Sequence, residues 1–91
     1  MTILIKELLG EEFQVTVDAK NLTSHNVTLT DVTHQNLTNG KVNKKELIEF
    51  SFKFLLEREP NTSILPSFEL SLISTYFPEY LKTVKEWSNK N

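Results

Sequence analysis

The sequence predicts an α+β protein: a three-stranded antiparallel β-meander followed by a long central helix and two shorter C-terminal helices. Three observations favour this fold class. Apolar residues alternate with polar ones early in the chain, a strongly marked apolar helix begins near Asn43, and prolines delimit the segments after it. The chain has 91 residues and no long linker, so a single domain over residues 1–91 is expected.

The first three segments alternate as β-strands do. Strands are expected over residues 3–9 and 13–17, joined by a turn at 9–12 where a glycine interrupts the pattern. After a polar connection over 20–24, a third strand is expected from about residue 25 to residue 31. The sequence therefore predicts a meander of adjacent antiparallel strands.

The segment between this meander and the long helix has a weaker pattern. Asp31 is suited to cap a single helical turn that holds Val32 and Leu37, and Asn39-Gly40 is suited to end it. Only one helical turn is therefore expected here.

The helix predicted from Asn43 to Arg58 is apolar around most of its circumference. Asn43 is a favoured N-cap, Glu46 stands where a capping box needs it, and Pro60 stops the helix at Glu59. At 100° per residue its apolar side chains span roughly 240°, against about 100° on an ordinary surface helix. The sheet is expected to cover one side, and the C-terminal helices, a second subunit or both must cover the other.

Two shorter helices are expected after the loop of residues 60–66. The first ends at residue 76 and begins at Phe68 or Ser71. The second begins at Pro78, because the fixed φ of proline suits the first helical position, and runs to about residue 87. Its expected apolar stripe consists of Tyr80, Leu81, Val84 and Trp87.

Composition argues against several classes of function. The net charge is −2 and nine of the ten basic residues are lysine, which disfavours a nucleic-acid binder. The absence of cysteine excludes disulfides, thiolate metal sites and thiol catalysis. No apolar run approaches the ~20 residues of a membrane span, and the N-terminal segment lacks the basic region of a signal peptide. A soluble cytoplasmic protein without a cofactor is expected.

Two groups of polar residues are candidates for a site, and each has a structural alternative. His25, His34 and Asp31 offer half of a metal site or an acid–base pair, but no second pair of ligands clusters with them. Arg58 is suited to clamp a carboxylate or phosphate, or to cap the end of the long helix and pair with a glutamate. The structural role is favoured for both groups.

A basic cluster and an aromatic set are two further candidates. The lysine corner, defined as Lys41, Lys44 and Lys45, is suited to an acidic partner, although such lysines are more often simply solvated. The aromatic set is suited to line a ligand pocket, but its spacing is more typical of core and interface. This set consists of Phe68, Tyr76, Phe77, Tyr80 and Trp87.

Two segments resemble a group of small uncharacterised bacterial proteins. They are Leu56–Leu65, which reads LEREPNTSIL, and Ile73–Tyr80, which reads ISTYFPEY. The resemblance spans about residues 25 to 80. It implies no activity, cofactor or catalytic residue.

These observations predict a non-enzymatic protein–protein interaction module. The chain carries no phosphate-binding glycine loop, nucleophile elbow or zinc-protease motif. The 240° apolar arc suggests self-association through the apolar helices, as a homodimer, or binding of another protein. The alternative is an antitoxin-like or DNA-binding regulator that uses the lysine corner. The expected interaction residues are Phe50, Phe52, Phe54, Arg58, Tyr76, Tyr80 and Trp87.

Overall fold

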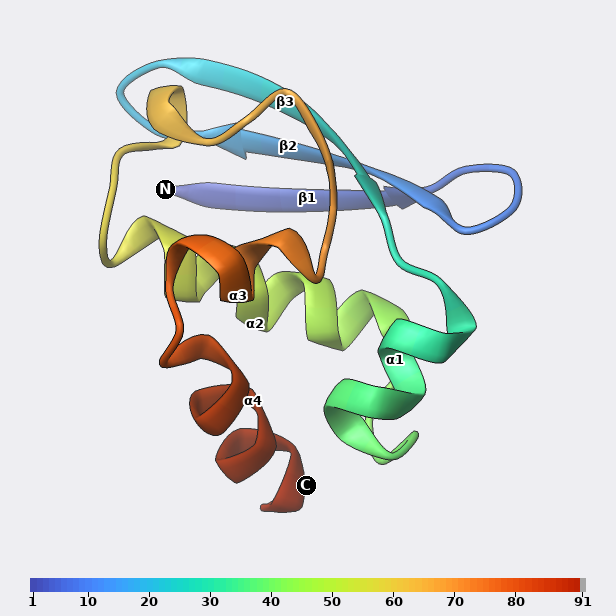
Figure 1. Cartoon of the computed structure of the whole chain (residues 1–91). Coiled ribbons are helices and arrows are strands. Elements are labelled where there is room, and N and C mark those ends of the chain that lie inside the picture. Colours follow the sequence, from blue (N-terminus) through green and yellow to red (C-terminus); the bar gives the residue numbers. More distant parts are fainter. Residues whose placement is uncertain (91) are drawn as a thin grey trace.

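A four-stranded sheet covers one side of the long helix, and two short helices cover the opposite side (Figure 1). The computed structural model describes residues 1–90 and confirms the α+β class. Its strands are β1 (Thr2–Glu7), β2 (Glu12–Asp18), β3 (Leu22–Thr28) and β4 (Ser67–Glu69). Its helices are α1 (Asp31–Thr38), α2 (Lys44–Leu56), α3 (Leu72–Tyr76) and α4 (Tyr80–Asn89), with a 3₁₀ turn, η1, over Asn61–Ser63.

The predicted meander is present, but its third strand lies three residues earlier than expected. β1, β2 and β3 pair antiparallel, with Asp18 opposite Leu22 across a tight turn. The residues 22–24, predicted as a connection, therefore belong to β3. The first three residues of the strand escaped prediction because its burial is confined to His25 and Val27, while Ser24 and Asn26 lie on the solvent face.

The fourth strand was not predicted. β4 runs parallel to β3, and two backbone hydrogen bonds fix its ends. Asn26 N–H donates to the Pro66 carbonyl at 2.8 Å, and Leu70 N–H donates to the Thr28 carbonyl at 2.9 Å. A strand of three residues is too short to show an alternating pattern, so only the tertiary structure reveals it.

The segment predicted as a single turn forms α1, a helix of eight residues. Thr30, not Asp31, is its N-cap, and the Thr30 hydroxyl accepts the Thr33 N–H at 3.1 Å. The predicted end is confirmed, because Asn39 and Gly40 adopt left-handed φ values of 54° and 72°. The extent was underestimated because α1 buries few apolar side chains.

The start of α2 is confirmed in atomic detail. Asn43 and Glu46 form the full capping box, with Asn43 Oδ1 accepting the Glu46 N–H at 2.8 Å. The helix ends at Leu56, before the predicted end at Arg58. It tightens there because Arg58 N–H bonds the Leu55 carbonyl at 2.9 Å, in a 3₁₀-type turn.

The chain covers the apolar arc of α2 by itself. On the sheet side, the Phe52 ring lies 5.5 Å from that of His25 and 6.2 Å from that of Phe68, between centroids. On the opposite side, the Phe54 ring packs edge-on against Phe77 and Tyr80. The α2 side chains buried in this way are Leu47, Ile48, Ser51, Phe52, Phe54 and Leu55.

The C-terminal helices follow the prediction with shifted boundaries. α4 begins at Tyr80 and not at Pro78, which lies in the turn before it. Its buried residues are Tyr80, Val84 and Ser88. Leu81, predicted in the apolar stripe, is 44% exposed, because the face of α4 toward α2 is centred on Tyr80 and Val84.

Candidate functional site

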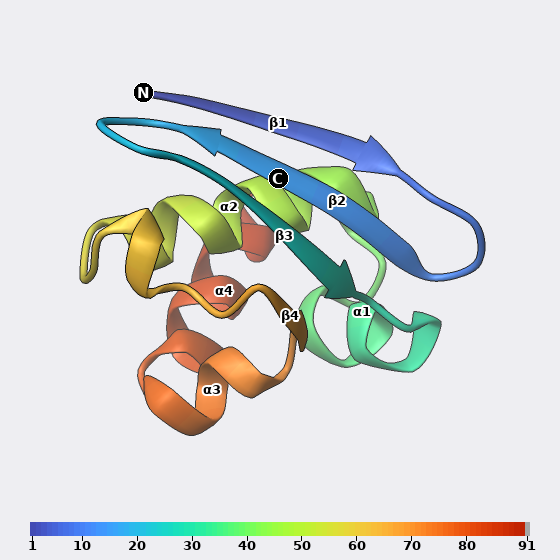
Figure 2. The same ribbon diagram turned by 90° about the horizontal axis from the view of Figure 1, so that it is seen from above.

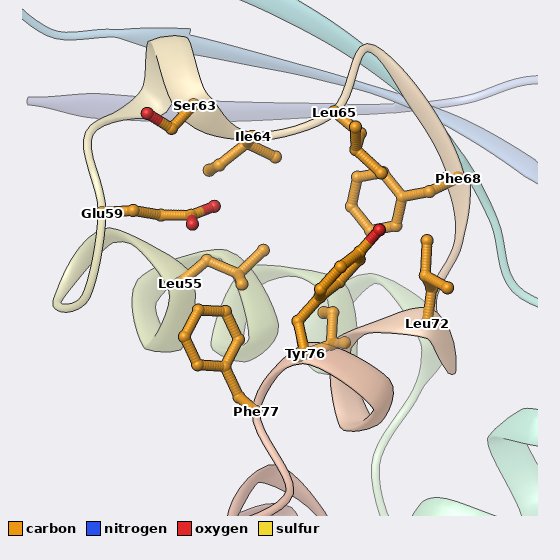
Figure 3. Close-up of a pocket in the computed structure, with 10 residues that line it drawn as sticks. Leu55, Glu59, Ser63, Ile64, Leu65, Phe68, Leu72, Tyr76 and Phe77 are labelled. Atoms are coloured by element: carbon orange, nitrogen blue, oxygen red, sulfur yellow. The ribbon is translucent and has the colours of Figure 1, made fainter.

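An apolar pocket of about 400 Å³ opens between the C-terminal end of α2, the loop after η1, and α3 (Figure 3). Its lining comes from one stretch of the chain, between residues 55 and 77, which the fold turns around the hollow. The residues that line it are Leu55, Glu59, Ser63, Ile64, Leu65, Phe68, Leu72, Ile73, Tyr76 and Phe77.

The pocket has a buried floor and an exposed apolar rim. Leu55, Ile64 and Ile73 form the floor and are at most 6% exposed. Leu65 and Tyr76 form the rim, 42% and 64% exposed respectively. Large apolar side chains with this exposure beside a cavity are typical of a binding surface.

One carboxylate stands in this apolar lining. Figure 3 shows the Glu59 side chain reaching across the mouth toward Ile64 and Leu55. Within residues 1–90 this carboxylate makes no ion pair and no hydrogen bond. Glu59 is therefore a half-buried negative charge that a cationic group on a ligand would neutralise.

A buried polar network holds the pocket wall against the sheet. The His25 Nδ1–H donates to the Leu65 carbonyl at 2.8 Å, because that carbonyl only accepts. Nε2 then accepts from the Thr23 hydroxyl at 2.9 Å, and the Thr23 oxygen accepts the Asn61 amide at 2.8 Å. Asn61 also bonds the Asn21 carbonyl at 2.9 Å. The structural role predicted for His25 is confirmed: it fixes the loop that forms the pocket wall.

Only one of the predicted interaction residues, Tyr76, lines this pocket. Phe52, Phe54 and Tyr80 lie in the core, at most 3% exposed. Phe50 and Trp87 are half-buried and stack on each other, with centroids 4.2 Å apart and planes 16° from parallel. Core and interface packing was the favoured interpretation of the aromatic set, but three of its five residues, Phe68, Tyr76 and Phe77, line the pocket, and of the five only Tyr80 is fully buried.

Arg58 has the structural role predicted for it. Its Nη1 donates to the Phe54 carbonyl at 2.8 Å, so it caps the end of α2, and its Nε lies 3.3 Å from the Glu79 carboxylate. The guanidinium also lies 3.6 Å from the centroid of the Phe54 ring. These contacts occupy the side chain and leave it poorly placed to clamp a ligand.

The lysine corner is partly neutralised within the chain. Lys44 lies 2.6 Å from the Asp31 carboxylate, and its hydrogen bond and charge lower the pKa of Asp31. Lys41 donates to Asn89 at 2.8 Å. Of the three lysines, Lys45 alone makes no such contact with the described part of the chain.

The remaining titratable candidates form no metal site. His34 Nε2 bonds the Val42 carbonyl at 2.6 Å, which ties α1 to the start of α2. Nowhere in residues 1–90 do three or more His, Asp or Glu side chains cluster closely enough to hold a metal ion. None of the helices described there is long and apolar enough to cross a membrane.

A buried hydroxyl pair joins α2 to α4 outside the pocket lining. Ser51 donates its only hydroxyl hydrogen to the Leu47 carbonyl at 2.7 Å, so the Tyr80 hydroxyl donates to Ser51 at 2.6 Å. Burial raises the pKa of Tyr80 well above its ordinary value, which the hydrogen bond with Ser51 opposes and the charge of Glu69 reinforces. This pair is a fully buried structural contact.

Sequence reasoning missed four pocket residues that matter most to its chemistry: Glu59, Ile64, Leu65 and Leu72. The available signal was the loop of residues 60–66, in which Ile64 and Leu65 are apolar residues flanked by prolines. The segments that resemble small bacterial proteins supply most of the pocket, but that resemblance stays a prediction. No family model matches the chain, and no significant match was found among curated proteins or solved structures.

Proposed function

We propose that the protein is a small non-enzymatic interaction module whose pocket receives an apolar side chain of a partner polypeptide. A Lys or Arg next to that side chain would pair with Glu59. The observation that carries the proposal is the unpaired carboxylate at the mouth of an otherwise apolar pocket. Protein interfaces commonly anchor one aromatic or aliphatic side chain in such a pocket, with charged pairs at its rim.

Size and shape favour a side chain over a whole small molecule. The volume of about 400 Å³ lies near the lower end of the range of about 300–1,000 Å³ for ligand pockets. The rim residues Leu65 and Tyr76 extend the apolar surface beyond the cavity, where the rest of a peptide would lie. An extended apolar rim is of use to a polypeptide partner and of little use to a compact ligand.

Two earlier expectations have weaker support. The argument for self-association through the apolar helices is weaker, because α2 buries its apolar arc against the sheet, α3 and α4 and leaves little of it for a second subunit. A DNA-binding role through the lysine corner also has little support, because Lys44 and Lys41 already have partners within the chain.

Binding of two short peptides to isotopically labelled protein tests the proposal. The probes are acetyl-Phe-Lys-amide and acetyl-Phe-Glu-amide, and the readout is the chemical shift of backbone amides. The lysine peptide should shift the amides of Leu65, Tyr76 and Phe77 at millimolar concentration, and the glutamate peptide should bind about fivefold more weakly.

Two matched variants isolate the carboxylate. Glu59→Gln should abolish the preference for the lysine peptide, because it removes the charge and keeps the shape. Glu86→Gln removes a charge from an exposed position of α4 outside the pocket, so it should leave the preference unchanged. Absence of shifts at the pocket with either peptide, or an undiminished preference in Glu59→Gln, would overturn the proposal.

A further inference from the structure

β1 forms an open edge of the sheet. Figure 2 shows it at the margin, with β2 on one side and no other element beyond it. Leu8 N–H donates to the Glu12 carbonyl at 2.9 Å, which continues the β1–β2 ladder and fixes its phase. Because backbone bonds alternate sides in an antiparallel ladder, Ile3, Ile5 and Glu7 direct their N–H and C=O groups to the open edge.

The side chains at this edge are apolar on both faces. Leu4 points away from the helices and is 61% exposed, whereas Ile3 and Ile5 point toward them and are only half-buried. A six-residue edge strand of this composition is a ready template for another strand. Lys6 alone gives the middle of the edge a charge, and it lies on the solvent face.

We propose that two copies of the chain join at this edge, with β1 pairing antiparallel to β1 of the second copy about a two-fold axis at Leu4. Ile3 of each copy lies opposite Ile5 of the other. Both residues direct their backbone groups outward, so each such pair exchanges both of its hydrogen bonds. Leu4 faces Leu4 of the second copy as a close non-hydrogen-bonded pair, which buries its exposed side chain.

Charge complementarity selects this register. The axis at Leu4 places Lys6 opposite Thr2 of the second copy, and Thr2 is opposite Asp18 in its own sheet. Lys6 and Asp18 of the two copies then share one row on the solvent face, two strand spacings of about 4.8 Å apart. The four-carbon stem of Lys6 spans the short Thr2 side chain and brings its ammonium to Asp18.

Neighbouring registers lack this match. An axis at Ile5 would set Glu7 opposite Ile3 of the second copy on the helix-facing side, which brings a charge against an apolar side chain. It would also place Lys6 directly across from Leu4 of the second copy. Neither Lys6 nor Asp18 has an ion-pair partner within residues 1–90, so both are available for the pairing.

Sedimentation and light scattering test the dimer directly. The chain has a mass of 10.5 kDa, and at micromolar to millimolar concentration the parent should show a reversible species of twice that mass. Leu4→Lys opposes two ammonium groups at the axis and should raise the dimer dissociation constant by about tenfold or more. The matched control is Val32→Lys, which places a lysine at a similarly exposed apolar residue on α1, away from β1, and should leave the dissociation constant unchanged.

A charge exchange tests the register. Lys6→Glu and Asp18→Lys should each weaken the dimer several-fold, because each opposes like charges across the interface. The double variant should restore parental affinity, since no contact between Lys6 and Asp18 exists within one chain. Failure of the double variant to recover refutes the register.

Amide hydrogen exchange gives an independent readout. The amides of Ile3 and Ile5 should become protected as concentration rises, while those of Leu4 and Lys6, already bonded to β2, should not change. A parent that stays monomeric at millimolar concentration, or a dimer that Leu4→Lys leaves intact, would overturn the proposal.

Discussion

Replacement of Phe54 by alanine is the sharpest test of how the chain covers α2. The Phe54 ring is 3% exposed and contacts its surroundings on several sides. Its centroid lies 6.0 Å from that of Phe77 and 5.2 Å from that of Tyr80, at interplanar angles of 81° and 65°, and Arg58 lies over its face. Removal of the ring therefore leaves a cavity whose walls belong to three different segments and cannot collapse together.

The magnitude follows from this environment. Replacement of a buried phenylalanine by alanine lowers the free energy of unfolding by about 3–5 kcal/mol. The two aromatic contacts of Phe54 place the expected loss for Phe54→Ala at about 4 kcal/mol. At about 0.05–0.15 kcal/mol per residue, a chain of 91 residues has a total stability of roughly 5–14 kcal/mol. The variant should therefore be close to unfolding at room temperature.

Urea unfolding followed by far-UV circular dichroism measures the effect. The matched control is Phe50→Ala, the same substitution one turn earlier in the same helix. Phe50 is half-buried and has one aromatic contact, the stack on Trp87, so its loss should cost about 2 kcal/mol. If Phe54→Ala costs under 1 kcal/mol, or if Phe50→Ala costs as much, the described cover of α2 is wrong.

Two further outcomes are expected. Asn43→Ala removes the side chain that accepts the Glu46 N–H, so it should lower the free energy of unfolding by about 1 kcal/mol in urea titrations. Asn43→Gly should lower it by less. Equal stability of the alanine variant and the parent would contradict this role of the capping box. Tyr80 has a pKa raised above its ordinary value of 10.0 in the folded state, so the stability it gives is present below about pH 10 and is lost as pH rises further, at about 1.4 kcal/mol per pH unit. At pH 7, Tyr80→Phe should lower the free energy of unfolding by about 1 kcal/mol, because Ser51 no longer receives a hydrogen bond from the tyrosine hydroxyl. Between about pH 9 and 11.5 the stability of this variant should fall less than that of the parent. Parallel curves of stability against pH for the two proteins would refute this.

Local patterns predicted the parts of the fold that local chemistry controls. The start of α2 at Asn43 and the end of α1 at Asn39 depend on side chains and backbone conformations within a few residues, so the sequence displays them directly. The strand of residues 13–17 was predicted because its alternation reports burial on one face. The structural role of Arg58 followed from its place at the end of a helix.

Features that depend on distant contacts were displaced or missed. β4 exists only because the chain returns to β3 after about 40 residues, and its own three residues carry no periodicity. The boundaries of β3 moved because Leu22 pairs with Asp18 despite a polar neighbourhood. The pocket residue Glu59 was not among the predicted interaction residues, because its place in the pocket depends on how the loop after η1 and α3 fold back against the end of α2.

The sequence by itself determined that a helix with an apolar arc of roughly 240° begins at Asn43 and requires cover from two sides. It did not determine what provides the cover, because a second subunit satisfies the same pattern as the protein's own helices. The tertiary structure decided this: Tyr80 and Phe77 pack against Phe54 while the sheet covers Phe52. The hydrophobic effect is non-directional and does not depend on which part of the chain supplies the apolar surface. The periodicity of the sequence therefore shows that the apolar arc must be covered, and only the fold shows which residues cover it.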